Sequence, residues 1–302
     1  MKTKILITGA SGFVGQNLTA NLQGSGLDVV PLKRVQLEEL EDAMLHNVDT
    51  IVHLAGKAHD LKNVSSSDDY YAVNFELTRK LYDAFLQSNA KNFVFISSVK
   101  AAADVVDGVL TEDIIPDPKT HYGKSKLMAE AYIISQELPV NKSFYILRPC
   151  MIHGPKNKGN LNLLYQFIKR RIPYPLAAFQ NKRSFLSIEN LCFVIKELIC
   201  QKDVPSGVYN IADDESLSTT EVVGILAQAI GKRPLLWRIS KPLIIIAAKI
   251  GDTLKLPLNT ERLNKLTEDY VVSNSKIIKA LNVKLPVSAR VGLLATSNSF
   301  KS

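Results

Sequence analysis

Apolar side chains form two kinds of pattern along this chain of 302 residues. Some stand in short continuous runs, and others recur every three or four positions over longer segments. A continuous run is typical of a strand buried on both faces of a parallel sheet, whereas the longer spacing predicts a helix with one buried face. Strands are predicted at 5–8, 27–32, 50–56, 92–96, 143–149 and 207–211. The segments between them predict helices, notably at 16–22, 37–46, 68–89, 120–138 and 188–200.

The alternation of these strands and helices indicates the fold class. Successive strand-helix-strand units connect by right-handed crossovers, and a series of them builds a doubly wound parallel sheet. We therefore predict an α/β fold, in which the late strand 207–211 extends the sheet.

Beyond Pro149 the pattern changes. Residues 151–182 are richer in proline, lysine and asparagine, and helices dominate from Leu217 onward. One of them follows the start signature Ser218-Thr219-Thr220-Glu221. We predict a first domain at 1–150, completed by 184–212, and a smaller, mostly helical lobe at 151–183 and 213–302.

The longest apolar stretch runs from Pro242 to Ile250 and contains Lys249. A helix needs about 20 apolar residues to span a bilayer. We therefore expect no integral membrane segment and interpret this stretch as a buried helix.

Composition limits the classes of partner and the cellular compartment. The formal net charge is +8, which favours anionic partners. Nucleic acid, an anionic membrane and phosphorylated metabolites are all partners of this kind. The basic residues are spread along the chain without a nucleic-acid motif, so we expect no nucleic acid, and a dinucleotide with a sugar diphosphate would use the surplus. The alternative is that most of these side chains form a solvated basic surface. The three cysteines, Cys150, Cys192 and Cys200, are too scattered for a disulfide framework or a metal cluster. Met1 to Lys4 lead straight into the first strand and leave no room for a signal peptide, so we expect a cytoplasmic protein.

Gly9, Gly12 and Gly15 follow the first strand at intervals of three and open the next helix. Backbone N–H groups at that helix start would face outward and suit a dinucleotide pyrophosphate. In this arrangement Gly9 makes the tight turn, Gly12 leaves room for the phosphates, and Gly15 lets helix and strand pack closely.

Lys33 and Arg34 end the second strand, where a dinucleotide would place its adenosine ribose. An acidic residue there bonds the free 2′-hydroxyl, whereas a basic one accommodates a 2′-phosphate. No acid follows the strand, so the sequence favours NADP over NAD. The alternative is that both side chains only solvate a loop.

Tyr122 and Lys126 stand four residues apart at a helix start, so both project from one face. Ser98 ends the neighbouring strand. Hydride transfer between a nicotinamide and a carbinol or ketone requires a proton to move at the same oxygen, which Tyr122 could supply or accept. We expect Lys126 to lower the pKa of Tyr122 and to hold the nicotinamide ribose, and Ser98 to orient the substrate oxygen. Alternatively, the tyrosine belongs to the core and the lysine is a solvated charge.

Several motifs together resemble the extended short-chain dehydrogenase/reductases, a group of nucleotide-sugar epimerases, dehydratases and reductases. They are Thr8 to Gly15, His53-Leu54-Ala55-Gly56, Ser97-Ser98, Tyr122-Gly123-Lys124-Ser125-Lys126, Leu147-Arg148-Pro149 and His153-Gly154-Pro155. The resemblance covers nearly the whole chain and implies an NAD(P)-binding Rossmann domain. It implies catalytic roles for Ser98, Tyr122 and Lys126, and a structural role for Asn74. Cofactor contacts are implied at Gly9, Ser11, Gly12, Phe13, Val14, Gly15, Leu54, Ala55 and Gly56.

In the second lobe the resemblance implies that Asn160 and Leu161 face the diphosphate of a UDP-sugar. Arg183 looks like the family's phosphate-binding arginine, and Arg262 is a weaker candidate. Residues 156–160 and 181–185 most resemble the bacterial surface-polysaccharide branch, which includes UDP-glucose 4-epimerase-like proteins and UDP-4-keto-hexosamine reductases. The long helices 68–89 and 120–138 could form the four-helix interface of a homodimer, as in relatives.

The chain departs from the family pattern at informative places. Val99-Lys100 replaces the Asp-Glu pair of dehydratases, which argues against loss of water. The region between the strands at 27–32 and 50–56 is shorter than in most members, so the family's third strand is expected to be reduced. Our first hypothesis is an NADPH-dependent 4-keto-sugar reductase. The alternatives are a UDP-hexose 4-epimerase with bound NAD and a dinucleotide-binding protein without turnover. The sequence does not identify the sugar.

Overall fold

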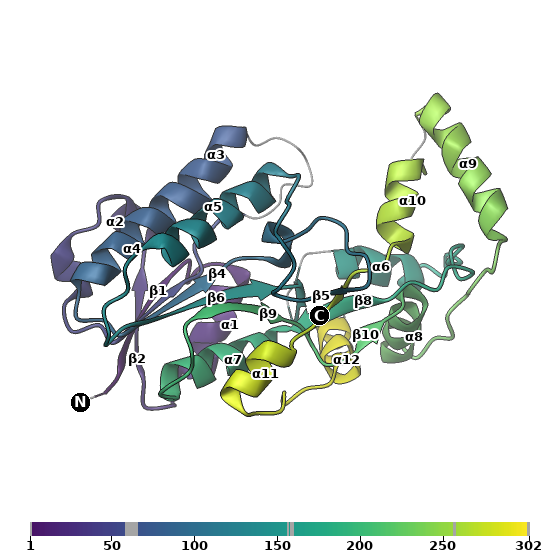
Figure 1. Cartoon of the computed structure of the whole chain (residues 1–302). Helices are drawn as coiled ribbons and strands as arrows, with labels where there is room; N and C mark the ends of the chain where they lie inside the picture. Colours follow the sequence, from purple (N-terminus) through teal and green to yellow (C-terminus); the bar gives the residue numbers. More distant parts are fainter. Residues whose placement is uncertain (1, 58–65, 156, 158–159, 256–257, 301–302) are drawn as a thin grey trace.

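The computed structural model describes residues 2–57, 66–155, 157, 160–255 and 258–300 (Figure 1). Its main sheet has six parallel strands in the spatial order β2-β1-β3-β4-β6-β9. Their bounds are β1 (Lys4–Thr8), β2 (Asp28–Leu32), β3 (Thr50–His53), β4 (Asn92–Ile96), β6 (Ser143–Pro149) and β9 (Gly207–Ile211). The predicted doubly wound α/β sheet is therefore confirmed. The strand order reverses at β1, and ligands of such sheets bind at the carboxyl ends of the strands beside this point.

Helices cover both faces of the sheet (Figure 1). Side chains alternate along β1, so Ile5 and Ile7 join one core cluster and Leu6 joins the other. The first cluster includes apolar residues of α1 (Phe13–Leu22), α7 (Ile188–Cys200) and α11 (Ser275–Leu281). The second includes those of α2 (Arg34–Glu38), α4 (Leu77–Gln87) and α5 (His121–Ser135). This two-sided burial explains why the strands are apolar throughout.

At one edge the sheet ends with β2. Pro31 of this strand lacks an N–H group, which an edge strand tolerates because one side has no neighbour to bond. Only α2 and the 3₁₀ helix η1 (Asp42–Leu45) lie between β2 and β3. Among the described residues no strand lies between β2 and β3, as the short segment predicts.

The second lobe surrounds a small sheet of three strands in the order β10-β8-β7. Their bounds are β7 (Met151–His153), β8 (Arg183–Ser187) and β10 (Ser216–Leu217). The lobe's helices are α6 (Asn160–Lys169), α8 (Thr219–Ala229), α9 (Lys241–Leu254), α10 (Thr260–Thr267) and α12 (Ala289–Ser299). Ser218 caps α8 by accepting the Glu221 N–H, so the predicted helix start is confirmed. A third pair, β5 (Val109–Leu110) with β11 (Val271–Val272), links the last part of the chain to the first domain.

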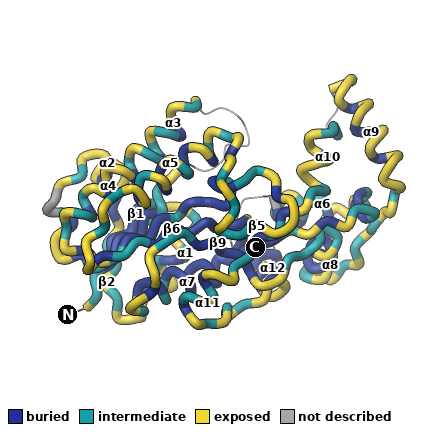
Figure 2. Tube along the Cα trace, viewed as in Figure 1, coloured by how far each residue is buried: buried dark blue, intermediate teal, exposed yellow. Residues whose placement is uncertain are grey.

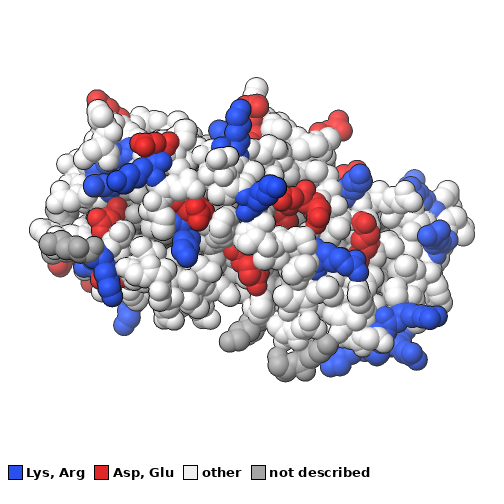
Figure 3. All heavy atoms as spheres, turned by 90° about the horizontal axis from the view of Figure 1, so that it is seen from below, with Lys and Arg blue, Asp and Glu red and all other residues white. Residues whose placement is uncertain are grey.

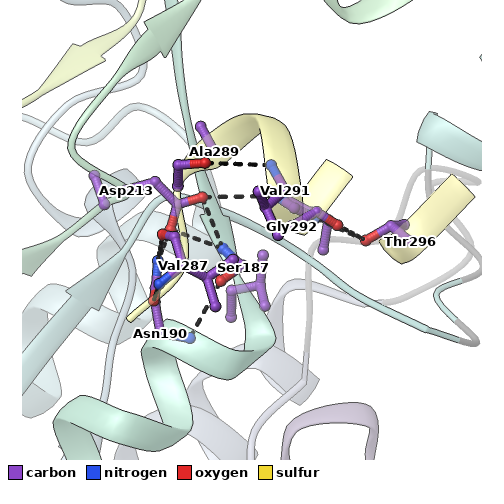
Figure 4. Close-up of polar contacts among 12 residues, drawn as sticks. Ser187, Asn190, Asp213, Val287, Ala289, Val291, Gly292 and Thr296 are labelled. Carbon is purple, nitrogen blue, oxygen red and sulfur yellow. Dashed lines mark hydrogen bonds and ion pairs between the residues drawn. The ribbon is translucent and has the colours of Figure 1, made fainter. Parts of the chain in front are cut away.

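A buried polar network holds the small sheet against the last helix (Figure 4). The Asp213 carboxylate accepts the Ser187 N–H at 3.0 Å and the Asn190 side-chain amide at 2.7 Å. Asn190 also donates to the Val287 carbonyl at 2.8 Å. Nearby, His153 Nδ1 lies 2.9 Å from Thr296 Oγ1 of α12. These bonds tie the end of β8 and the start of α7 to the segment just before α12, and β7 to α12 itself.

The apolar stretch around Pro242 does form a helix, α9, but our expectation that it is buried was wrong. Leu243 and Ile250 are 61% and 51% exposed, whereas Ile244 and Ala248 are buried. Figure 1 shows α9 and α10 together, extending away from the body of the molecule, and Figure 2 shows α9 exposed along most of its length. None of the described helices is both long and apolar enough to cross a membrane.

Candidate active site

The three glycines lie where β1 passes into α1. Gly9 has φ +67°, and a Cβ there would lie 2.7 Å from the Ala55 nitrogen. A Cβ on Gly15 would overlap the Gly9 carbonyl and the Ala10 backbone. The tight turn and the close helix-strand approach expected of Gly9 and Gly15 are therefore present.

Gly12 differs from Gly9 and Gly15, because the space that a side chain would occupy there is mostly free of protein atoms. Among described atoms a Cβ there would approach only the Gly9 carbonyl oxygen, at 3.3 Å. Gly12 is also the N-cap of α1, so it offers no side chain to the first N–H groups, and the first turn carries no acid. These features fit a dinucleotide pyrophosphate. Ser11, Phe13 and Val14 belong to the same turn, and a Cβ on Gly154 would lie 3.2 Å from the Phe13 ring.

His53 organises the end of β3, where Leu54, Ala55 and Gly56 follow. Its Nδ1 lies 2.6 Å from Thr8 Oγ1, which in turn accepts the Ala55 N–H at 3.1 Å. Its Nε2 lies 2.9 Å from Thr78 Oγ1 of α4. Burial, with a smaller contribution from the Lys126 charge, lowers the pKa of His53 to about 3. His53 is therefore neutral at physiological pH and ties the turn after β3 to that after β1.

Ser98 and Tyr122 meet at the carboxyl end of β4. Ser98 caps the 3₁₀ helix η3 (Val99–Ala101), and its hydroxyl hydrogen-bonds Tyr122, which lowers the pKa of the phenol. Gly123 makes this meeting possible, because a Cβ there would overlap the Lys100 carbonyl and lie 2.8 Å from Pro118. Burial outweighs the Ser98 bond, so the pKa of Tyr122 is raised above 10.

Lys126 lies one helical turn after Tyr122 and is 4% exposed. Its ammonium donates to the Ile96 carbonyl at 2.8 Å and lies 4.7 Å from the centre of the Phe95 ring. Burial lowers its pKa to about 8. We expected Lys126 to lower the pKa of Tyr122, but the structure shows no such effect, because the groups that act on the phenol are burial, Ser98 and Tyr70. The expected lowering of the phenol pKa is therefore not observed, since burial raises it.

Asn74 connects the turn after β3 to the helix that carries Tyr122. It lies in a π-helical turn (Ala72–Glu76) between α3 (Ser67–Tyr71) and α4. Its side chain accepts the Lys57 N–H at 2.7 Å and donates to Ser125 Oγ at 3.1 Å. Ser125 in turn donates to the Tyr122 carbonyl at 2.9 Å. Asn74 thus has the structural role that the resemblance implied, and π-turns of this kind are frequent at functional sites.

A buried ion pair that the sequence did not predict acts on Lys126. Arg148 of β6 donates to both carboxylate oxygens of Glu130, with Nη2–Oε2 at 2.5 Å and Nε–Oε1 at 3.0 Å. The Ser97 hydroxyl donates to the same carboxylate. Glu130 lies one turn after Lys126, and its charge raises the pKa of that lysine. Arg148 stood in the Leu147-Arg148-Pro149 motif, but nothing in the sequence paired it with Glu130.

A second unforeseen residue is Lys100, which directly follows the Ser98 region. Its ammonium donates to the Asp104 carbonyl at 2.8 Å and lies 4.4 Å from the centre of the Tyr270 ring. Its pKa is lowered, mainly by burial. The charges of Asp104 and Glu268 oppose this lowering, and those of Arg183 and Lys265 add to it with smaller effects. Lys100 therefore lies in a mixed cluster of basic and acidic side chains two residues after Ser98.

Arg183 starts β8 and is already engaged. Its Nη1 donates to the Lys265 carbonyl at the end of α10, at 2.7 Å, and its Nη2 lies 3.9 Å from Glu268 Oε1. A phosphate at Arg183 would therefore share the guanidinium with these groups or replace them.

The other predicted residues are more dispersed. Leu161 is 5% exposed, and its side chain belongs to the core of the second lobe, so only its backbone could face a ligand. The side chain of Asn160 lies outside the described residues. Arg262 is exposed on α10. Lys33 and Arg34 are exposed after β2, and Arg34 Nε bonds Glu38 Oε1 at 2.8 Å.

The chain is similar to several characterised proteins. It is 30% identical to UDP-glucose 4-epimerase of Vibrio cholerae, over 99% of this chain and 96% of that protein. It is also 30% identical to the N-acetyl-alpha-D-glucosaminyl-diphospho-ditrans,octacis-undecaprenol 4-epimerase of Escherichia coli O157:H7, over 92% and 86%. A UDP-2-acetamido-2,6-beta-L-arabino-hexul-4-ose reductase of Pseudomonas aeruginosa matches at 30% over 53% of this chain and 38% of the reductase.

Solved structures share the fold. The structure of MoeE5 in complex with UDP-glucuronic acid and NAD covers 99% of both chains with a TM-score of 0.78 and 23% identity. The structure of RMD from Pseudomonas aeruginosa complexed with NADPH covers 99% of both chains with a TM-score of 0.74 and 19% identity.

A model of the NAD dependent epimerase/dehydratase family matches residues 5–212. This segment contains the glycine turn, the turn after β3, and Ser98, Tyr122 and Lys126. The family match and the near-complete alignments lead to one conclusion: the chain is an enzyme that belongs to the NAD dependent epimerase/dehydratase family.

Proposed function

We propose that the protein transfers a hydride at C4 of a UDP-sugar for bacterial surface polysaccharide. The observation that carries the proposal is the hydrogen-bonded pair of Ser98 and Tyr122, with buried Lys126 one turn away, at the strand ends beside the glycine turn. A protein that only bound a dinucleotide would have no use for this proton-transfer set.

The dinucleotide would supply the hydride acceptor or donor. The turn Gly9–Gly15 would hold its pyrophosphate, and Leu54, Ala55 and Gly56 would line its path along the sheet. We assign the Lys126 ammonium to the nicotinamide ribose. A Cβ on Gly56 would lie 3.0 Å from Lys126 Nζ, so the absence of a side chain at Gly56 leaves room for the ribose beside this ammonium. Ser98 would orient the sugar oxygen, and Tyr122 would take its proton during oxidation or return it during reduction.

Two candidate reactions differ in whether the hydride is returned to the sugar from which it came. An epimerase removes the hydride from C4 and returns it to the other face of the same carbon, whereas a reductase delivers it to a 4-keto-sugar. Our first hypothesis was a reductase. The two relatives aligned over nearly all of this chain are both named as 4-epimerases, whereas the reductase matches about half of it. We therefore now favour the 4-epimerase and keep the reductase as the second candidate.

The choice of cofactor is tied to this question. Lys33 and Arg34 support NADP, and NADP supports a reductase. The Arg34 pair with Glu38 weighs little against this, because side chains that are 70% and 46% exposed form a weak ion pair. If both cations contact a 2′-phosphate, NADPH should bind at least tenfold more tightly than NADH, and replacing them with Asp and Ala should reverse the order. Equal affinities in titration calorimetry would assign both residues to a solvated loop.

For the substrate we assign the diphosphate to Arg183, the backbone at Leu161 and the first turn of α6. Arg262 is a weaker candidate. The second lobe, residues 151–183 and 213–302, would hold the nucleotide sugar, and residues 1–150 with 184–212 the cofactor. We propose a cytoplasmic homodimer joined through α4 and α5, where Met128 and Ile134 are 43% and 53% exposed.

Product analysis tests the proposal. An epimerase interconverts UDP-glucose with UDP-galactose, or the N-acetyl pair, with no net change in nicotinamide absorbance. A reductase leaves these sugars unchanged and consumes one NADPH per molecule of a UDP-4-keto-6-deoxy-hexosamine. Failure of both reactions while the dinucleotide still binds would support the non-catalytic alternative.

A further inference from the structure

An apolar stripe runs along the outer side of α9. Leu243, Ile246, Ile250 and Leu254 are 61%, 54%, 51% and 62% exposed. Their spacing of three, four and four residues places them on one face of the helix. We call these four side chains the α9 stripe.

Contacts with the second lobe and with α10 hold α9 in this position. Ile244 and Ala248 pack into the core of the second lobe, and Gly251 allows the backbone at Leu258 to approach closely. Asp252 accepts the Thr260 N–H at 2.9 Å and the Thr260 hydroxyl at 2.5 Å. The helix therefore buries one narrow face in its own lobe while the α9 stripe points elsewhere.

Basic residues are frequent in and next to α9. Residues 231–255 contain six Lys or Arg residues and one acid, Asp252. At 100° per residue Lys249 lies next to Ile246 at the border of the stripe, and it forms no ion pair with the described residues. Lys241 at the start of α9 faces the other side and lies over the Phe179 ring, and Lys255 follows the last turn. Trp237, just before α9, is 57% exposed. On the opposite face, seen from below, Lys and Arg also outnumber acidic side chains at the end of the molecule formed by the second lobe (Figure 3), so the basic character of this lobe is not confined to α9.

We propose that the α9 stripe docks on the surface of an anionic lipid bilayer, with α9 lying in the interface. An amphipathic helix with Leu and Ile on one face and lysines beside it binds anionic membranes by burying the apolar face and attracting the headgroups. With 14 residues α9 is too short to span the hydrocarbon core, so it would lie on the membrane.

The charge pattern favours a membrane over a second copy of this chain. In a two-fold symmetric pair the same surface meets itself. Lys249 of both helices would then flank the joined stripes, with no acidic residue on this face of α9 to pair with it. An anionic lipid surface instead supplies the opposite charge along the whole helix.

Vesicle co-sedimentation of the full chain tests the proposal. The probe is vesicles of two parts phosphatidylcholine to one part phosphatidylglycerol, compared with pure phosphatidylcholine at low and high salt. We expect the wild-type protein to sediment with the mixed vesicles, and less at high salt because screening weakens the attraction. Ile246→Glu/Ile250→Glu should lower the partition coefficient at least tenfold. Val140→Glu/Val291→Glu adds the same charges at exposed valines on other elements and should bind as wild type.

Three results would overturn the proposal. The first is a wild-type protein that stays in the supernatant with mixed vesicles, and the second is equal binding by the two double variants. The third is a smaller particle for the α9 variant than for wild type in sedimentation velocity without lipid, which would show that a second copy covers the stripe. If Ile246→Glu/Ile250→Glu does not fold, Lys249→Gln/Lys255→Gln tests the charge alone. It should weaken binding to mixed vesicles about fivefold per lysine, and unchanged binding would equally overturn the proposal.

Discussion

Arg148 and Glu130 form a buried bidentate ion pair directly beneath the proposed active site, with both side chains almost completely enclosed. Removing one partner of such a pair leaves an uncompensated charge, which typically costs 3–5 kcal/mol. We expect Glu130→Gln to lower the free energy of unfolding by about 3 kcal/mol in urea denaturation. Glu76→Gln breaks a half-exposed pair with Arg79 and should cost less than about 1 kcal/mol. Equal losses of unfolding free energy in both variants would show that the buried pair stabilises the fold no more than the exposed one.

The same substitution should change the chemistry of Lys126. Glu130 is the charge that raises the pKa of this lysine against the effect of burial. In a folded Glu130→Gln protein the pKa of Lys126 should therefore fall below its value of about 8. Nitrogen NMR of labelled lysine measures this directly, and an unchanged pKa would mean that Glu130 acts only on stability.

The raised pKa of Tyr122 gives a pH prediction that separates the two candidate reactions. Tyr122 can accept a proton during C4 oxidation only when its phenol is deprotonated. Because its pKa is raised above 10, the deprotonated fraction of the free enzyme grows as the pH rises toward that value. kcat/KM for epimerisation should thus rise from about pH 6 to about pH 9, whereas reduction, which needs the protonated phenol, should stay flat. Tyr122→Phe should lower kcat at least a hundredfold while cofactor binding persists. Tyr132→Phe removes a half-buried hydroxyl of the same helix that donates to Asp83, and it is the matched control. An equal loss there would remove the assignment.

Arg183 should bind the diphosphate of the substrate. Losing one side of a charge-assisted contact costs about 2–5 kcal/mol in a desolvated site. Arg183→Ala should therefore raise the UDP dissociation constant at least tenfold in titration calorimetry and leave the dinucleotide constant unchanged. Arg79→Ala removes an exposed arginine of α4 and should change neither. Unaltered UDP affinity in Arg183→Ala would leave the arginine with its observed role of holding the end of α10.

His53 should make stability depend on pH. Its pKa is about 3 in the folded protein and about 6.5 when unfolded, so between these values the unfolded chain binds the extra proton. The contribution of neutral, buried His53 to the free energy of unfolding is therefore complete above pH 6.5. It is lost as the pH falls below this value, by up to about 1.4 kcal/mol per pH unit. Urea denaturation at pH 7 and pH 5 should show this loss, and His53→Gln should show a shallower dependence. Parallel curves for the two proteins would contradict the assignment to His53.

Much of the fold was predictable because its signals are local. The strands are apolar throughout, as burial on both faces requires, and α7 begins and ends where its apolar pattern does. The start of α8 was predictable for the same reason, since Ser218 and Glu221 bond within one turn.

The features that were missed depend on tertiary contacts. The apolar content of α9 does not reveal which of its faces a neighbour covers. Glu130 and Arg148 come from a helix and a strand that only the folded sheet brings together. The pKa of Tyr122 was misjudged because the four-residue spacing places Lys126 near it in the chain, whereas the ammonium is directed at the Ile96 carbonyl.

The π-helical turn at Ala72–Glu76 makes segment length a constraint in its own right. It accommodates one residue more than an α-helical turn of the same rise, so the helical phase differs before and after Asn74. Deleting a single residue there would restore a regular helix and rotate either Asn74 or the buried Tyr82 and Phe85 by about a hundred degrees. Side-chain replacements in this turn can be judged one at a time, but a change in the number of residues would uncouple the active site from the core.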